Sequence, residues 1–105
     1  MAAKFPFNDL HSFKDYVGFV RICAPDLFPE REGVGHEDQW TLDLAFSGLR
    51  LGLQMAEQEK GPRSVFTDCA YFIEEAEKSY RAGDMRAGFT HLDNVRKLLA
   101  RVPSQ

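Results

Sequence analysis

The sequence predicts an all-α fold, an antiparallel four-helix bundle with helices at about residues 9–23, 36–60, 64–81 and 84–101. Three of these segments repeat apolar residues three and four positions apart, and a helical wheel of the other gives a single polar stripe. Glycine or proline lies close to the end of each segment, as is usual where a helix stops. The chain has 105 residues, of which 44% are hydrophobic and 28% charged, and this suffices for one core. We therefore expect residues 1–105 to form a single helical domain.

The first predicted helix, residues 9–23, has one apolar face. Asn8 or Ser12 is the expected N-cap, because short polar side chains bond to the free N–H groups of a first helical turn. Pro25 ends the helix, because it disfavours the helical conformation at the residue before it. The apolar face consists of Leu10, Phe13, Val17 and Val20.

Residues 36–60 are compatible with two structures. Large apolar residues alternate on either side of Ser47-Gly48, which suits a β-hairpin at 40–55 and an α+β fold. On a helical wheel, however, the polar residues gather in one stripe and the small ones opposite it, so that another backbone could approach closely. Thr41 is the only β-branched residue of the hairpin candidate, and this composition favours the helix. The stripe is Asp43, Arg50, Gln54 and Glu57, and the small residues are Thr41, Ala45, Gly48, Gly52 and Ala56.

The last two predicted helices, 64–81 and 84–101, read as a tight helical hairpin. Ser64 is the expected cap of the first of them. Gly83 can adopt the left-handed conformation that ends a helix, and Asp84 can cap the next one. The faces expected to point inward are Val65, Cys69, Phe72, Ile73, Ala76 and Tyr80 in one helix and Met85, Phe89, Leu92, Val95 and Leu99 in the other.

Within the segment 72–101, small and aromatic residues surround a Gly-Asp turn at Phe72, Ala76, Gly83, Asp84 and Gly88. In these positions the segment resembles a single tetratricopeptide hairpin, in which a Gly-Asp turn separates helices that pack through small and aromatic residues. Two positions depart from that pattern. Glu75 stands where the family prefers an apolar residue, and Val95 stands where it prefers alanine. No second copy follows at a period of about 34 residues, which a solenoid requires. The pattern therefore indicates a helical hairpin in general, and we assign no family.

Charge and targeting signals narrow the function classes. The net charge of −3 argues against nucleic acid as a partner, because phosphate binding draws on surplus positive charge. Neither a signal-peptide pattern nor an apolar run of 18 residues occurs, so we expect a cytoplasmic location and no membrane association. Cys23 and Cys69 lie far apart in the sequence, and their spacing matches no zinc-ligand motif. We expect both to be buried free thiols.

Few residues suggest catalysis. His11 and Asp15 lie four apart, as surface pairs on a helix commonly do. The acids of the cluster 36–38 suit the positive end of a helix dipole. Cys69 and His91 could face each other on neighbouring helices, but no third group would orient the imidazole. We therefore predict no catalytic residue, no metal ligand and no cofactor, and an enzyme remains the less favoured class.

Prolines and glycines predict a long loop at residues 25–35, and long loops are often functional. Acidic residues concentrate here: the block Asp26–Asp43 holds six acids and one base, whereas Arg81–Arg101 holds five bases and two acids. Leu27 and Phe28 either fold back as a plug over the core or serve as anchors for a partner. The predicted partner-binding residues are Leu27, Phe28, Glu30, Glu32, His36 and Trp40.

Two function hypotheses follow. The first is a small protein–protein interaction module, such as an adaptor, an inhibitor or an immunity-type protein, which acts through an acidic surface on another protein or on a second copy in a homodimer. The alternative is a ligand-binding or enzymatic subunit whose pocket forms at an oligomer interface. Four-helix bundles host many functions, so the fold alone does not decide between them.

Overall fold

The computed structural model describes residues 5–103 and contains four α-helices. They are α1 (Leu10–Cys23), α2 (Leu42–Lys60), α3 (Ser64–Arg81) and α4 (Met85–Leu99), with one turn of 3-10 helix, η1 (His36–Asp38), before α2. The predicted all-α class is confirmed. No strand occurs within the described residues, so the alternative with a β-hairpin at 40–55 is wrong.

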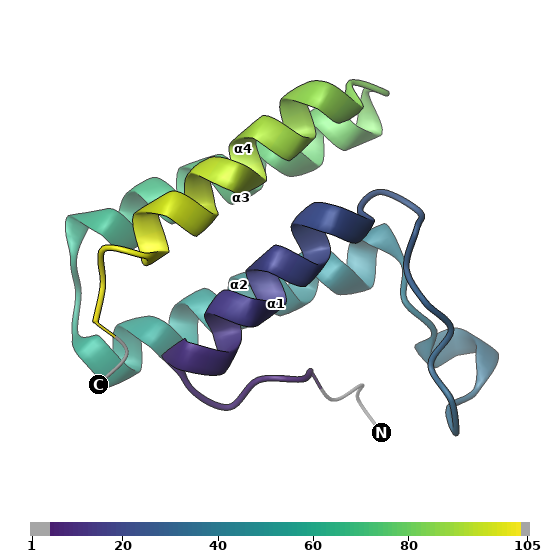
Figure 1. The fold of residues 1–105 in the computed structure, drawn as a ribbon, viewed down its shortest axis with the longest axis horizontal. Coiled ribbons are helices and arrows are strands. Elements are labelled where there is room, and N and C mark those ends of the chain that lie inside the picture. The colour runs from purple at the N-terminus through teal and green to yellow at the C-terminus, as the bar shows by residue number, and fades with distance from the viewer. Residues whose placement is uncertain (1–4, 104–105) are drawn as a thin grey trace.

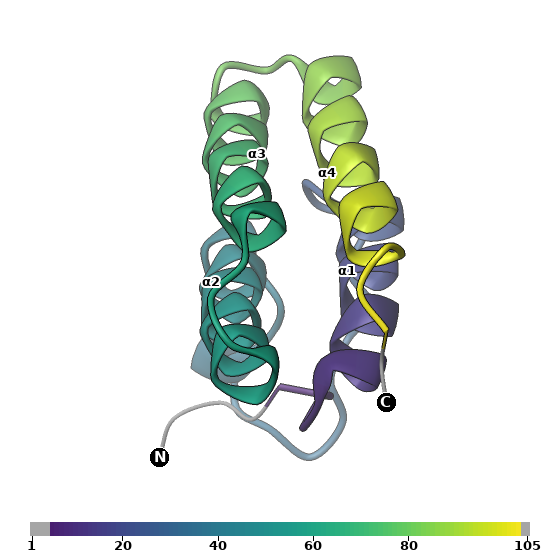
Figure 2. The same cartoon turned by 90° about the vertical axis from the view of Figure 1, so that its left-hand side faces the viewer.

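The helices form two layers, one of α1 and α2 and the other of α3 and α4 (Figure 1). Helix α1 packs against α4 and α2 packs against α3, so each helix contacts two antiparallel neighbours, as the turned view in Figure 2 makes clear. Apolar side chains from all four helices fill the space between them. The largest fully buried ones are Tyr16, Phe13, Phe46, Phe66, Leu10, Leu49, Ile73, Leu92, Leu99, Val17, Val20 and Val95.

Glycines let aromatic rings approach the helix backbones in both layers. A Cβ atom added at Gly52 in α2 would overlap the ring of Phe13 in α1. A Cβ atom at Gly88 in α4 would lie 2.6 Å from the ring of Tyr80 in α3. The small stripe predicted for α2 therefore does admit a neighbour, and what enters is an aromatic side chain.

The first two helices begin differently from the prediction. Asp9, rather than Asn8 or Ser12, caps α1, and its carboxylate accepts a hydrogen bond from the Ser12 N–H at 2.9 Å. Helix α2 begins at Leu42 and not near residue 36. Thr41 caps it in extended conformation, with its hydroxyl oxygen accepting from the backbone N–H of the third helical residue at 3.1 Å. The polar residues 36–39 carry no apolar periodicity that would have placed this boundary.

The α3–α4 turn is confirmed in two of its predicted features. Gly83 has φ of +85°, and the Asp84 carboxylate accepts from the Ala87 N–H at 3.1 Å. The Ser64 cap is wrong, because Ser64 is the first residue of α3 and follows Arg63, which makes no capping bond.

The apolar face of α4 is narrower than predicted. Met85 is 58% exposed and Phe89 is 43% exposed, although both were expected to point inward. The buried positions are Gly88, Leu92, Val95 and Leu99, and Met85 and Phe89 lie along one edge of that face.

Candidate functional site

Aromatic side chains cluster where the N-terminal segment, α1 and the α1–α2 loop meet. Trp40, which directly precedes the cap of α2, lies at the centre of the cluster. Its ring centroid lies 5.3 Å from that of Phe19, 5.9 Å from Tyr16, 6.0 Å from Phe28 and 6.3 Å from Phe5. These distances are typical of favourable ring contacts.

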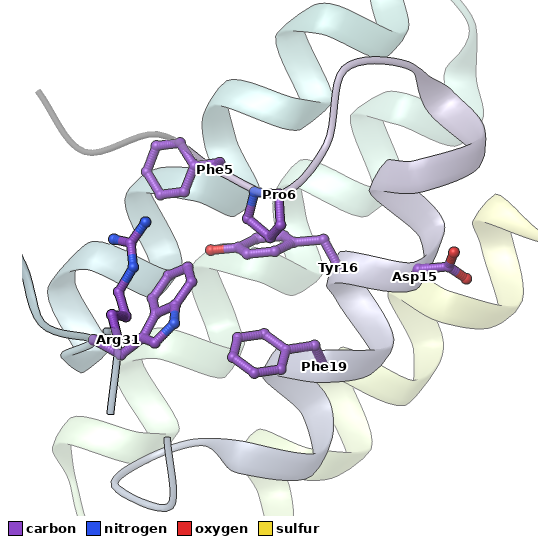
Figure 3. A pocket seen from close by; sticks show the side chains of 7 residues that line it. Phe5, Pro6, Asp15, Tyr16, Phe19 and Arg31 are labelled. Atoms are coloured by element: carbon purple, nitrogen blue, oxygen red, sulfur yellow. The ribbon is translucent and has the colours of Figure 1, made fainter. Parts of the chain in front are cut away.

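A pocket of about 590 Å³ opens among these rings (Figure 3). Its volume falls within the usual range for sites that take a small molecule. Arg31 lies at one side of it, and Asp15 lies at the other with its carboxylate pointing away from the rings. The lining residues of this aromatic pocket are Phe5, Pro6, Asp15, Tyr16, Phe19, Arg31 and Trp40.

Tyr16 supplies a fixed wall of the pocket. Its hydroxyl donates a hydrogen bond to the Ala45 carbonyl of α2 at 2.9 Å. Burial raises the pKa of this phenol well above its ordinary value, and the charge of Arg31 only partly opposes that effect. Tyr16 therefore stays protonated at neutral pH and joins α1 to α2.

The side chain of Gln39 holds the loop between α1 and α2 in shape. Its amide oxygen accepts from the Arg31 N–H at 2.7 Å, and its amide nitrogen donates to the Arg31 carbonyl at 2.9 Å. The Arg31 guanidinium lies over the Trp40 ring, 4.8 Å from its centroid, and donates to the Asp38 carbonyl at 3.1 Å. These contacts fix the loop against the aromatic cluster.

The six predicted partner-binding residues divide into two groups. Phe28 and Trp40 are half-buried in the cluster, so Phe28 folds back as the plug hypothesis expects. Leu27 does not, because it is 73% exposed. Glu30, Glu32 and His36 are also exposed, and within residues 5–103 none of the three makes an ion pair.

Most of the pocket wall consists of residues that no pattern in the sequence marks as neighbours. Phe5 and Pro6 precede the first helix in a segment without periodicity, so their place against Trp40 depends on the tertiary fold. Phe19 lies outside the predicted apolar face of residues 9–23, and an aromatic residue at such a position was the available signal. Arg31 is the lone base within the acidic block, which was noted only as a count.

The thiols and the remaining polar candidates lie elsewhere. Cys69 is fully buried, and that burial, with a smaller effect of Asp68, raises its pKa to about 12. Cys23 is only half-buried, in contrast to the prediction. His91 stacks on the ring of Phe72 with centroids 5.8 Å apart, and in the described part of the chain no hydrogen bond joins it to Cys69.

Metal-ligating clusters and membrane-spanning helices are both absent from residues 5–103. No group of three or more His, Cys, Asp and Glu side chains is placed there to hold a metal ion. None of the described helices combines the length and the apolarity that crossing a bilayer requires. Comparison of the chain with protein-family models, with curated proteins and with solved structures finds no match.

Proposed function

We propose that this chain is a small helical interaction module that binds a protein partner through its α1–α2 loop. The observation that carries the proposal is the aromatic pocket, which opens beside a loop rich in exposed carboxylates. The loop surface is the predicted set Leu27, Phe28, Glu30, Glu32, His36 and Trp40.

The chemistry of this surface indicates what the partner must supply. Aromatic walls favour a large apolar side chain, since interface anchors usually fill such pockets. Residues 26–38 hold five acids and one base, Arg31, so the segment around that anchor has to be basic. Leu27 adds an exposed apolar side chain from the same loop. The partner is thus a basic protein surface with one or two protruding apolar side chains.

The loop is also prepared for binding in its free state. The paired bonds between Gln39 and the Arg31 backbone and the stacking of Arg31 on Trp40 hold it in place before a partner arrives. A preorganised surface loses less conformational entropy on association than a flexible one.

Photo-cross-linking in the source cells tests the proposal. A photoreactive phenylalanine analogue at position 27 is expected to give a specific protein adduct, which the double substitution Glu30→Lys and Glu32→Lys removes. The matched control carries the analogue at Tyr71 of α3, which is 59% exposed and lies outside the loop surface. No adduct at position 27, or an equal adduct at both positions, would contradict the proposal. If a small molecule added before irradiation prevents formation of the adduct, a ligand-binding subunit would be favoured instead.

A further inference from the structure

The outer face of α4 has the chemistry that the loop surface requires of a partner. Met85 and Phe89, one helical turn apart, are exposed along one edge of the helix. The solvent side beside them carries Arg86, Lys97 and, just beyond the helix, Arg101. With a rise of about 1.5 Å per residue, these bases extend over roughly 22 Å.

The two charged regions do not neutralise each other within one chain. Among residues 5–103, Asp43 is the only member of the acidic block that forms an ion pair with the basic block, through Arg81. Arg86 and Arg101 make no ion pair in the described structure, and neither does Glu30 or Glu32. Both regions are therefore available to a second molecule.

The fold prevents α4 from reaching the pocket of its own chain. Helix α4 lies in the other layer and packs on α1, where Arg21 and Asp93 form an ion pair at 3.5 Å. The N-terminal segment, which supplies Phe5 and Pro6, runs along the side of the α1–α2 layer that faces away from α3 and α4 (Figure 1). Any contact between α4 and the pocket must then join two copies.

We propose that the partner of the loop surface is a second copy of this chain, whose α4 docks on it. Met85 of the second copy enters the aromatic pocket, and Phe89 packs against the exposed Leu27 of the loop. Arg86 and Arg101 face the carboxylates of the loop. This inference rests on the proposed function and names the partner.

Sedimentation equilibrium of the wild-type chain is the first test. We expect the average mass to rise with concentration towards at least twice that of one chain. Salt screens charges across such a contact, so the association constant should fall on the order of ten-fold between about 50 mM and about 500 mM salt. A wild-type chain that remains monomeric at about 0.5 mM in low salt overturns the inference.

Charge exchange is the sharper test. One variant carries Glu30→Lys and Glu32→Lys, and the other carries Arg86→Glu and Arg101→Glu. Each variant alone presents like charges on both surfaces and should be monomeric. An equimolar mixture should associate again, because each loop then meets an α4 of opposite charge. Failure of the mixture to associate, when both variants melt as the wild type does, overturns the inference.

Two controls separate this result from general effects of charge. The double substitution Glu57→Lys and Asp68→Lys changes the net charge by the same amount as the loop variant does, at exposed sites away from both surfaces, and it should leave association unchanged. Met85→Ala should weaken association at least several-fold without altering the melting temperature.

If the wild type is monomeric while position 27 still cross-links to a different protein, the inference fails and the proposed function stands. If position 27 gives no adduct at all, both the inference and the proposed function are contradicted.

Discussion

The α1–α2 layer and the α3–α4 layer differ most in how their helices are joined. Residues 82–84 suffice to connect α3 to α4, whereas residues 24–41 connect α1 to α2. Both layers nevertheless pack by the same device, an aromatic ring seated on a glycine: Phe13 on Gly52 in one and Tyr80 on Gly88 in the other. The packing of a helix pair therefore does not need a long connection here, and the length of residues 24–41 calls for another explanation, which the proposed binding role would supply.

The glycine contacts should give the largest stability effects. We expect Gly52→Ala to lower the free energy of unfolding by about 1–3 kcal/mol, because its methyl group would overlap the fully buried Phe13 ring. Gly88→Ala should destabilise by a similar or smaller amount. Gly18→Ala is the matched control: nothing lies within 4 Å of its Cβ position, so it should stabilise α1 by about 0.5–1 kcal/mol. Chemical denaturation measures all three, and equal effects at positions 18 and 52 would contradict the packing.

Two neighbouring residues of the α1–α2 loop, Leu27 and Phe28, should contribute differently to the free energy of unfolding. Phe28→Ala removes ring contacts with Phe19 and Trp40 and should cost about 1–2 kcal/mol, with a shift in the fluorescence of Trp40, the only tryptophan. Leu27→Ala is the control, and its effect should stay within about 0.5 kcal/mol because the side chain is largely exposed. A larger loss of stability from Leu27→Ala than from Phe28→Ala would reverse the assignment of plug and anchor.

An ion-pair network joins the two layers and makes stability depend on pH. Partial burial of Glu77 opposes its ionisation, but hydrogen bonds from Arg50 and Arg81 outweigh that effect and hold the pKa below the ordinary 4.5. A carboxylate with a lowered folded-state pKa stabilises the protein above its unfolded pKa, and the contribution disappears as pH falls through the folded pKa.

Glu77→Gln should therefore be less stable than the wild type by about 0.5–1 kcal/mol at pH 7, with a difference that vanishes in acid. Denaturation midpoints measured from pH 7 to pH 3 check this expectation. Glu57→Gln, exposed and outside the ion pairs of the described residues, should show no such trend. A constant difference at every pH would mean that Glu77 acts through packing alone.

The cysteines should give the smallest effect, one visible only in reactivity. Because Cys69 is fully buried with a pKa of about 12, a thiol reagent at pH 8 should modify it only after unfolding. Cys23 is only half-buried, so it should react before Cys69 in the native protein, and because burial raises its pKa it should react more slowly than a free thiol. Rapid native labelling of Cys69, followed by mass spectrometry of the peptides, would show that α3 opens readily.

Periodicity predicted the bundle because each helix buries one face, and the Gly83–Asp84 turn was found because its chemistry is local. The aromatic pocket was beyond such reasoning, because Phe5 and Trp40 are far apart in sequence and meet only through the fold. The predicted start of α2 was several residues too early for a related reason. The Gln39 side chain binds the backbone of Arg31 and holds that segment outside the helix. Met85 lies at the edge of the apolar face of α4, and a helical wheel alone does not decide whether a residue at such an edge is buried or exposed.

Hydroxyl-radical footprinting tests the central claim most directly, because one experiment compares both layers. The chain would be oxidised in its source cells and, separately, as dilute purified protein, and the modification of each residue compared by mass spectrometry. If the loop surface is where the protein binds, oxidation of Leu27, Phe28 and Trp40 should fall several-fold in the cells. Exposed Tyr71 of α3 and Leu51 of α2 should be oxidised equally in both samples. Protection of Tyr71 and Leu51 with the loop residues unchanged would contradict the account.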